Sequence, residues 1–433
     1  HADGPAAVNQ IGTGEIDLSG GAGHGFRVNG ADGGTTLRAD VRSQGGTVFI
    51  DDAVTLGANV RIDTAVGAAG GANVDIDNTT GSGTVDGGFA LTVNPGTGGN
   101  VTIDGTVGGG TALDAVVVER GGTVTLPAVT ATAGTGGVDI GSLAAVTGIT
   151  LNGDISSNGG ATADIRLDGP VTLGASVVLD TDLTGEGTDA GDIVLTTNAG
   201  VDGGGSFALT LDATEDGAGA AGTVGVAAAA GTGAGAELTG FTVNGASQVD
   251  LGDVLVAGGS IDVTGTNIDL NGTLYQAVTS GAVTFDGAVD LTAGAATTVV
   301  RTEGAAADDI TFTSTIDDDV SGETALTVDA DNGTVGNAAV DLQGNVGATT
   351  PVGAFTVSGT PAQVDLANVR SDGADIGVRG TNIDLNGTLY QAVTSGAVTF
   401  TGAVDLTAGA ATTVVRTEGA AADDITFTST IDD

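Results

Sequence analysis

The feature that most limits how this chain can fold is a succession of short runs in which apolar and polar residues alternate. The apolar positions are mostly Val, Ile or Leu, the polar ones mostly Thr or Asp, and each run stops at Gly, Asn, Asp or Ser. Examples are AVTF, AVDLT, ALTV and QVDL. A period of two over such short lengths is typical of β-strands. Strong helix formers are scarce, since there is no Lys or Met and Ala usually stands beside Gly. We therefore predict an all-β protein.

The alternating runs belong to a longer internal repeat. Residues 266–318 recur at 381–433, and the replacement of Asp286 by Thr401 is the one difference between the copies. Weaker copies extend the pattern toward the N-terminus, for example VTLGANVRIDT and VTLGASVVLDT. We predict a divergent start and then repeat units of about 115 residues, with the boundaries 1–35, 36–150, 151–265, 266–380 and a partial unit 381–433. Because the last unit stops part-way and the chain contains no Met, we expect a segment of a longer array.

Two architectures accommodate this pattern. One is a string of β-sandwich domains, and the other is a right-handed parallel β-solenoid with roughly 20 residues per coil. The strand signals are closely spaced, no Pro- or Ser-rich linker separates the repeat units, and the Trp typical of many sandwich cores is absent. The 79 Gly suit the corners of coils, where the backbone often needs positive φ. We therefore predict a β-solenoid rod with super-repeats of about 115 residues.

The composition excludes several classes of function. Acidic residues number 54 and basic residues 10, which gives a net charge of −44 and argues against nucleic-acid binding. The absence of Cys excludes disulfides and Cys-ligated zinc, and the absence of Lys excludes a Schiff base. The longest uncharged stretch is mostly Gly and Ala, so we expect no membrane insertion. A Cys-free acidic chain fits the exterior of a bacterium.

Several of the repeated motifs resemble those of the filamentous-haemagglutinin-like β-strand-repeat surface proteins of bacteria. The similarity rests on VTLGANVRIDT, SGAVTFDGAVDLTAGAATTVV, DDITFTSTIDD and ALTVDADNGTVG, and it extends over about residues 36–433. The resemblance implies a giant secreted adhesin or filament with a solenoid fold and no catalytic residues. The secretion domain of that family is not recognisable in this sequence, so the export route stays open.

No catalytic constellation emerges from the sequence. The two histidines, His1 and His24, lie in the divergent start and do not recur. The other candidates are an Arg, a Glu and a Tyr that recur in both copies of the duplicated stretch as Arg301/Arg416, Glu303/Glu418 and Tyr275/Tyr390. An enzyme needs one site, so recurrence favours a scaffold role, and the scarcity of aromatic residues argues against a glycan-cleaving solenoid. We predict that the protein is not an enzyme.

Calcium is the one ligand that the sequence suggests, although no cofactor is required. Asp317 and Asp319 begin DDDVSG, and Asp180 and Asp182 begin DTDLTG. Both hexapeptides match the first half of a calcium loop, with oxygen ligands followed by a Gly turn, and both lack the Glu at position twelve. The high negative charge should also repel itself unless salt or divalent cations screen it. We therefore expect chelation at low salt to lower the melting temperature.

These observations predict a structural role. The leading hypothesis is a segment of a long extracellular bacterial filament or stalk, located outside the cell or on its surface. Its expected partner is itself, either through stacking of separate copies or through continuation of the same repeat array. The alternative is an adhesin, in which the rod presents a binding surface for cells, glycans or solid surfaces. An ice-binding role is disfavoured because Thr residues are irregularly spaced along the sequence.

Overall fold

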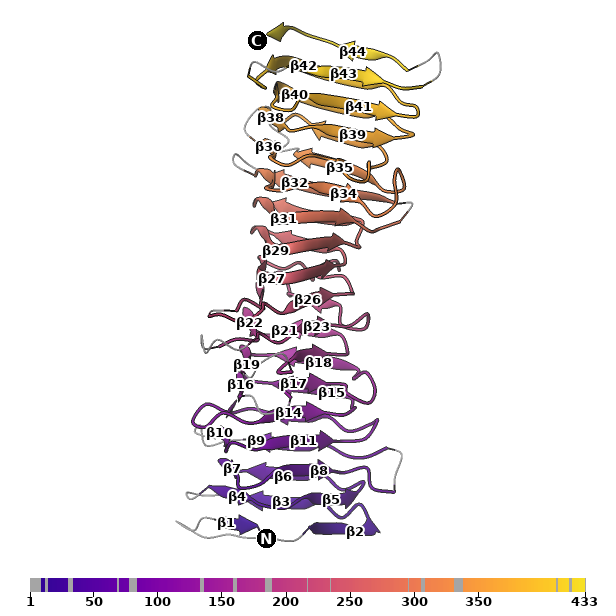
Figure 1. Ribbon diagram of the computed structural model, residues 1–433. Coiled ribbons are helices and arrows are strands. Elements are labelled where there is room, and N and C mark those ends of the chain that lie inside the picture. Colours follow the sequence, from indigo (N-terminus) through magenta and orange to yellow (C-terminus); the bar gives the residue numbers. More distant parts are fainter. Residues whose placement is uncertain are drawn as a thin grey trace. The chain divides into compact units, whose positions relative to one another are not determined.

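The structure is a computed structural model, and it describes residues 9–11, 15–29, 34–67, 70–77, 84–132, 136–158, 162–183, 189–215, 217–233, 235–294, 296–304, 308–330, 338–409, 412–419 and 423–432. The described residues form strands and turns and contain no helix. The chain divides into two compact units, His1–Ala228 and Ala229–Asp433, which are described separately below. In both units the strands are parallel and stack as the coils of a β-solenoid, as Figure 1 shows. The predicted fold class is confirmed.

In the first unit each coil contributes one strand to each of three faces, because every strand pairs with the third strand after it. The first face is β1 (Asn9–Ile11), β4 (Thr35–Leu37), β7 (Val54–Leu56), β10 (Thr84–Asp86), β13 (Thr106–Val107), β16 (Val129–Thr132), β19 (Ile155–Asn158), β22 (Val177–Asp180) and β25 (Leu209–Asp212). The second is β2 (Ile16–Ala22), β5 (Val41–Gln44), β8 (Val60–Asp63), β11 (Ala90–Asn94), β14 (Ala115–Val118), β17 (Val138–Ile140), β20 (Ile165–Leu167), β23 (Ile193–Leu195) and β26 (Thr223–Val226). The third is β3 (Phe26–Asn29), β6 (Val48–Asp51), β9 (Val74–Asp77), β12 (Val101–Ile103), β15 (Thr123–Leu126), β18 (Gly148–Leu151), β21 (Val171–Leu173) and β24 (Val201–Asp202).

In the second unit, several strands are long enough to bend around a corner and serve two faces of a coil. These long strands are β27 (Phe241–Leu251), β29 (Ile261–Leu270), β31 (Val283–Leu291), β40 (Ile376–Leu385) and β42 (Val398–Leu406). The remaining strands are β28 (Val254–Ala257), β30 (Leu274–Thr279), β32 (Thr297–Gly304), β33 (Ile310–Phe312), β34 (Ile316–Asp318), β35 (Ala325–Ala330), β36 (Ala339–Leu342), β37 (Phe355–Gly359), β38 (Gln363–Leu366), β39 (Val369–Asp372), β41 (Leu389–Val393), β43 (Val414–Thr417), β44 (Ile425–Phe427) and β45 (Ile431–Asp432).

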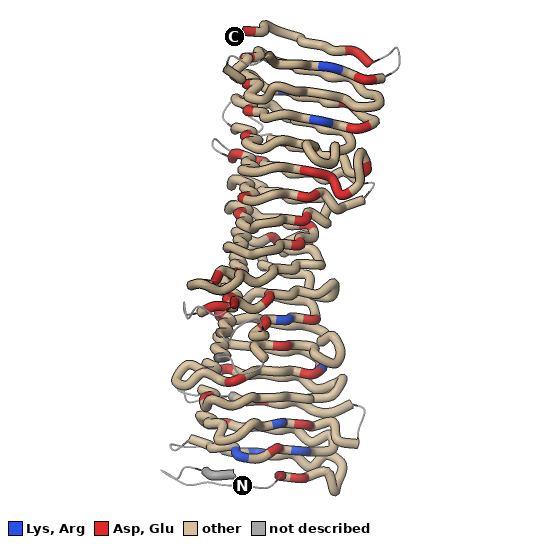
Figure 2. The backbone as a smooth tube through the Cα atoms, viewed as in Figure 1, with Lys and Arg blue, Asp and Glu red and all other residues tan. Residues whose placement is uncertain are grey.

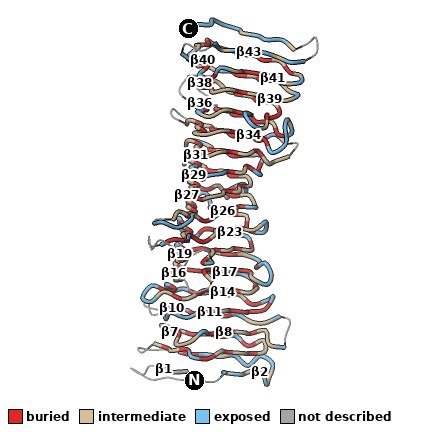
Figure 3. The backbone as a smooth tube through the Cα atoms, viewed as in Figure 1, coloured by how far each residue is buried: buried red, intermediate tan, exposed pale blue. Residues whose placement is uncertain are grey.

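The core of each unit consists of aliphatic ladders that run from coil to coil. On the third face of the first unit, one inward position is occupied in successive coils by Val48, Val74, Val101, Val124, Ile149, Val171 and Val201. All of these side chains are buried, and in Figure 3 buried positions alternate with partly exposed ones along the strands. Because the side-chain period of a strand is two, a run such as Val138–Ile140 or Ile165–Leu167 buries its first and third residues and leaves the one between them partly exposed.

Aromatic rings reinforce the core of the second unit. The Phe285 and Phe312 rings stack with centroids 5.1 Å apart, and the Tyr275 ring meets Phe285 edge-on at 5.8 Å. The Tyr275 hydroxyl donates to the carbonyl of Leu251 at 2.7 Å and accepts the N–H of Gly272 at 2.9 Å. Burial raises the pKa of Tyr275 far above its ordinary value, which fits a neutral phenol in a structural role.

The coils are longer than the sequence analysis predicts. The register places Val243 opposite Val263, 20 residues on, but it places Val177 opposite Leu209, 32 residues on. The expected spacing of roughly 20 residues is therefore the lower limit rather than the mean. The two units together hold about 15 turns, fewer than expected, because loops between short strands lengthen many coils without disturbing the register of the strands.

The two copies of the duplicated stretch form equivalent strands but occupy different faces of the second unit. The column of Thr284 continues through Thr311, Asp341 and Asp365 to Asp384, which lies in the second half of β40. The counterpart of Thr284 is Thr399 of β42, which instead lies opposite Gly377 in the first half of β40. The stretch of chain from a residue of the first copy to its counterpart in the second therefore spans one face less than a whole number of turns. The predicted super-repeat of about 115 residues is not confirmed, and the unit boundaries derived from it stay a prediction.

Glycines at β-bulges bend the long strands. Between β29 and β31 the register shifts where Gly265 and Thr266 lie opposite Gly287, and β40 and β42 repeat this arrangement with Gly380, Thr381 and Gly402. Gly287 has a φ of 152°. A Cβ on Gly287 would overlap the carbonyl oxygen of Gly265. Glycine is therefore required where the backbones of successive coils approach each other at this corner.

We expect Gly287→Ala to destabilise the second unit by about 1–3 kcal/mol, because the new methyl group forces two coils apart. Gly377→Ala is the matched control, since a Cβ there has open space around it and β40 keeps ordinary strand geometry. Urea unfolding measures both variants. Equal stability of the two variants would contradict the close approach at the corner.

Candidate functional site

The predicted calcium turn at Asp180 is closed by hydrogen bonds within the protein. Asp180 is the last residue of β22, and its Oδ1 accepts the backbone N–H of Asp182 at 2.9 Å. Asp182 is only 6% exposed. This is the geometry of an Asx turn, in which a carboxylate replaces a backbone acceptor just after a strand. Thr184 and Gly185, which complete the motif, lie outside the described residues.

The second predicted turn, at Asp317 and Asp319, is likewise occupied by backbone donors. Asp317 Oδ1 accepts the N–H groups of Thr349 and Thr350 at 2.8 and 3.1 Å, which ties β34 to the following coil. Asp319 is exposed. The turn therefore has a structural use that does not involve a metal ion.

The middle carboxylate of this turn, Asp318, is buried. Its Oδ2 accepts the N–H groups of Glu323 and Thr324 at 2.9 and 2.8 Å, while its Oδ1 is buried without a partner among the described residues. Burial is the main reason that the pKa of Asp318 lies above its ordinary value.

Acceptance of backbone N–H groups from the next coil is a general use of Asp and Asn in this chain. Asp253 Oδ1 accepts from Thr273 and Leu274 at 2.6 and 2.9 Å. The same arrangement recurs one duplication later, at Asn368. Others that accept from a neighbouring coil in this way are Asp40, Asp86, Asn100, Asp154, Asp192, Asp309 and Asp375. A short carboxylate or amide reaches a backbone one coil away, which explains why the acidic residues are mostly Asp and rarely Glu.

A metal site is not visible in the described part of the chain. Among those residues, no three His, Asp or Glu side chains lie close enough together to hold a metal ion. The calcium prediction therefore stays a prediction, and it now concerns turns whose carboxylates already accept hydrogen bonds.

We expect calcium to raise the melting temperature more than NaCl of equal ionic strength does, if the Asp317 and Asp180 turns bind the ion. NaCl reports only the screening of self-repulsion. Differential scanning calorimetry of the chelator-treated protein measures both salts. Equal rises at equal ionic strength would contradict the turn sites and leave screening as the whole effect.

The second unit contains two ladders in which acidic side chains are direct neighbours on the outer face. The register aligns Asp250, Asp269, Asp290 and Asp317 in one ladder, and Asp341, Asp365, Asp384, Asp405 and Asp432 in the other. Parallel strands are about 4.8 Å apart, so these like charges repel one another. Figure 2 shows acidic positions along the coils of both units and few basic ones. The recurring V/I-D-L motif is the sequence signal that could have revealed the ladders.

The ladders shift the acidity of their members. The pKa values of Asp269, Asp290 and Asp365 all lie above the ordinary value of 3.8, first because the carboxyls are partly buried and then because neighbouring carboxylates repel the charged form. For each group the folded state prefers the neutral carboxyl, so this contribution to stability is present at low pH. It is lost as the pH rises through the raised pKa.

We expect Asp290→Asn to raise the free energy of unfolding at pH 7 by about 0.2–1 kcal/mol, because it removes one like charge from a ladder. The advantage should shrink as the pH falls toward 3.8, where the wild-type carboxyl takes up a proton. Urea unfolding across this pH range measures the difference.

Asp372→Asn serves as the control of opposite sign. Hydrogen bonds from the hydroxyls of Thr394 and Ser321 hold the pKa of Asp372 below its ordinary value, so its charge is favourable in the folded state. This variant should be less stable than wild type at pH 7. A pH-independent effect of Asp290→Asn would contradict the ladder account.

The recurring Arg and Glu pair with each other in both copies, and the recurring Tyr lies in the core. Arg301 pairs with Asp329 at 2.8 Å and with Glu303 at 3.4 Å, so its charge is already neutralised. Tyr275 and its counterpart Tyr390 are buried in the core rather than placed in a cleft. His24 is exposed in a turn, and His1 lies outside the described residues.

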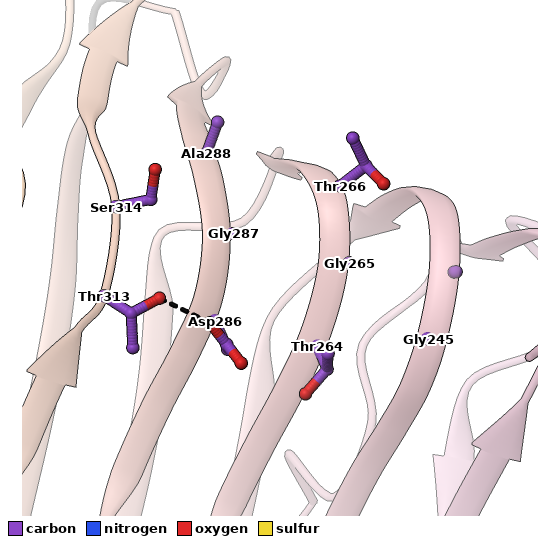
Figure 4. A pocket seen from close by; sticks show the side chains of 10 residues that line it. Gly245, Thr264, Gly265, Thr266, Asp286, Gly287, Ala288, Thr313 and Ser314 are labelled. Carbon is purple, nitrogen blue, oxygen red and sulfur yellow. Dashed lines mark hydrogen bonds between the residues drawn. The ribbon is translucent and has the colours of Figure 1, made fainter.

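Two open grooves lie at the glycine corners of the second unit, and sequence reasoning missed them. One groove of about 630 Å³ follows the bulges of β27, β29 and β31, as Figure 4 shows. Its floor is glycine backbone at Gly245, Gly265 and Gly287, and its other lining residues are Ala246, Thr264, Thr266, Asp286, Ala288, Thr313 and Ser314. The Thr313 hydroxyl donates to Asp286 Oδ1 at 2.5 Å.

A second groove occupies the equivalent corner of the other copy. Its volume is about 340 Å³, and it is lined by Thr360, Arg379, Gly380, Thr381, Thr401, Gly402, Thr428 and Ser429. Both grooves are rich in hydroxyl groups and lack aromatic side chains, so they suit a polar ligand better than an apolar one.

Comparisons with known proteins give no match. No protein-family model, curated protein or solved structure is similar to this chain. The resemblance to filamentous-haemagglutinin-like proteins therefore stays a prediction. Among the described residues, no helix is long and apolar enough to cross a membrane.

Proposed function

We propose that this chain is a structural segment of a long extracellular bacterial filament or stalk, and that it acts without catalysis. Support comes from the way the fold is stabilised. Inner side chains are buried by the coils above and below them, and the backbone hydrogen bonds of the strands run between coils. Such an arrangement can be lengthened by further coils without new kinds of contact.

The observation that carries this proposal is a comparison of the two copies at β43, β44 and β45, the strands with which the given sequence ends. Val414, Ile425 and Ile431 are exposed there by 40%, 44% and 48%. In the first copy the residues equivalent to the two isoleucines, Ile310 and Ile316, are fully buried.

The coil that covers the first copy shows what kind of partner fits this surface. Ile310 pairs with Val340 of β36, and Ile316 forms a bridge to Val346. We infer that β43, β44 and β45 are covered by a further parallel coil in the same way, supplied either by a continuation of the chain beyond the given sequence or by a second copy.

We expect the double variant Ile425→Asp/Ile431→Asp to lose the concentration-dependent self-association that this surface supports. The new carboxylates would have to be buried without a partner when a further coil stacks on them. Sedimentation velocity of the wild type and the variant measures association over a range of concentrations.

Leu143→Asp is the matched control, because Leu143 is 61% exposed but belongs to a loop of the first unit and to none of β43, β44 and β45. It should associate as the wild type does. Loss of association in Leu143→Asp alone, or unchanged association in the double variant, would contradict stacking at the last coil.

A second experiment covers the same surface with additional coils instead of mutating it. Residues 319–366, which follow the first copy, can be appended after residue 433 so that they cover the second. We expect this extension to raise the melting temperature and to reduce self-association, whereas the same residues in scrambled order should do neither. Immunogold labelling of intact cells then tests whether the protein forms filaments outside the cell.

The second candidate function is the adhesin, in which the solenoid presents a binding surface. The two hydroxyl-rich corner grooves favour it, because they offer polar groups to a ligand at a place where the backbone lies open.

A further inference from the structure

The two corner grooves of the second unit differ in charge. In the groove at β29 and β31, Asp286 lies opposite Thr264 in the register. In the groove at β40 and β42, Thr401 lies opposite Arg379. The single difference within the duplicated 53 residues, Asp286 against Thr401, therefore falls on the lining of a groove, and the nearest upstream lining residue differs as well.

These two differences act together to leave a cation in the second groove. An Asp at position 401 would face Arg379 directly across neighbouring strands and neutralise its guanidinium. With Thr401 in its place, Arg379 makes no ion pair with any residue that the structure describes, although acidic residues outnumber basic ones more than five to one.

The same replacement frees a hydroxyl group. Thr313 donates its hydroxyl hydrogen to Asp286 in the first groove. Its counterpart Thr428 has Thr401 at the corresponding place and no carboxylate to bind. The second groove thus combines an unpaired guanidinium with the hydroxyls of Thr360, Thr381, Thr401, Thr428 and Ser429 around a glycine floor.

We propose that the groove at Arg379 binds an acidic saccharide, with the guanidinium on a sugar carboxylate and the threonine and serine hydroxyls on sugar hydroxyls. A planar guanidinium with two parallel donors matches a carboxylate. A volume of about 340 Å³ is at the small end of the range for small-molecule sites, which suits one or two sugar rings. The groove at Asp286 does not bind this ligand, because its carboxylate repels it. This inference does not depend on the stacking of coils at the end of the chain.

The test uses the full chain and trigalacturonate as the probe, with the neutral trisaccharide galactotriose as the comparison, measured by isothermal titration calorimetry at physiological salt. We expect one site for trigalacturonate and binding at least about 10-fold tighter than that of galactotriose. Arg379→Thr, which copies the first groove at its Thr264 position, should weaken trigalacturonate binding by about 10- to 100-fold.

Two further variants exchange the grooves. Thr401→Asp should abolish binding by pairing with Arg379, and Thr264→Arg/Asp286→Thr should raise the number of sites from one to two. These residues are exposed or half-buried, so circular dichroism should show an unchanged fold. Absence of trigalacturonate binding, equal affinity for galactotriose, or full binding by Thr401→Asp would overturn the proposal. Equally tight, Arg379-dependent binding of triglutamate would overturn the assignment to a saccharide.

Discussion

The in-register parallel pairing of successive coils is the constraint on which the rest of each unit depends. A coil has no partner for its strand N–H and C=O groups except the coils on either side, and its inward Val, Ile and Leu find cover in the same place. Val101, for example, pairs with Val74 on one side and Val124 on the other. The turns also depend on the neighbouring coil, since Asp and Asn side chains accept hydrogen bonds from the backbone N–H groups of its turns. Other turn N–H groups bond to backbone carbonyls of a neighbouring coil, as that of Gly98 does to Gly70, so buried polar groups are satisfied between coils in both ways.

The same register makes the negative charge costly. Outward Asp residues of the V/I-D-L runs are aligned from coil to coil, so that like charges lie side by side. Other carboxylates lower their cost by accepting backbone N–H groups, as Asp317 does. Of the carboxylates that give the chain its charge of −44, some therefore stabilise turns by accepting hydrogen bonds, and others repel one another on the outer face. This division explains why Asp372 and Asp290 have pKa values on opposite sides of the ordinary one.

The strand positions and the all-β solenoid class could be predicted from the sequence. The alternation of apolar and polar residues in runs such as AVTF marks a strand whatever the length of the loops beside it. The length of a coil could not, since the loop between Val177 and Leu209 adds residues without altering the strand register. The faces that the duplicated stretches occupy could not be predicted either, because the sequence separation between the two copies does not reveal how many strands make up one turn. The grooves depend on bulges at Gly265 and Gly380, and a bulge is visible only once the neighbouring strand is known. Asp286 and Thr401 therefore looked like an incidental difference until the register placed them in the grooves.

The most direct test of stacked parallel coils is a set of engineered disulfides, because the chain contains no Cys of its own. Thr284 and Thr311 are register partners in the second unit, and Thr125 and Thr150 are partners in the first. Their Cα atoms should be about 4.8 Å apart, within disulfide reach, whereas Thr284 and Asp341 or Thr125 and Thr172 are two coils apart and beyond it. The account predicts rapid disulfide formation in monomeric Thr284→Cys/Thr311→Cys and Thr125→Cys/Thr150→Cys and none in the two-coil pairs. Crosslinking of the two-coil pairs in preference to the register partners would contradict it.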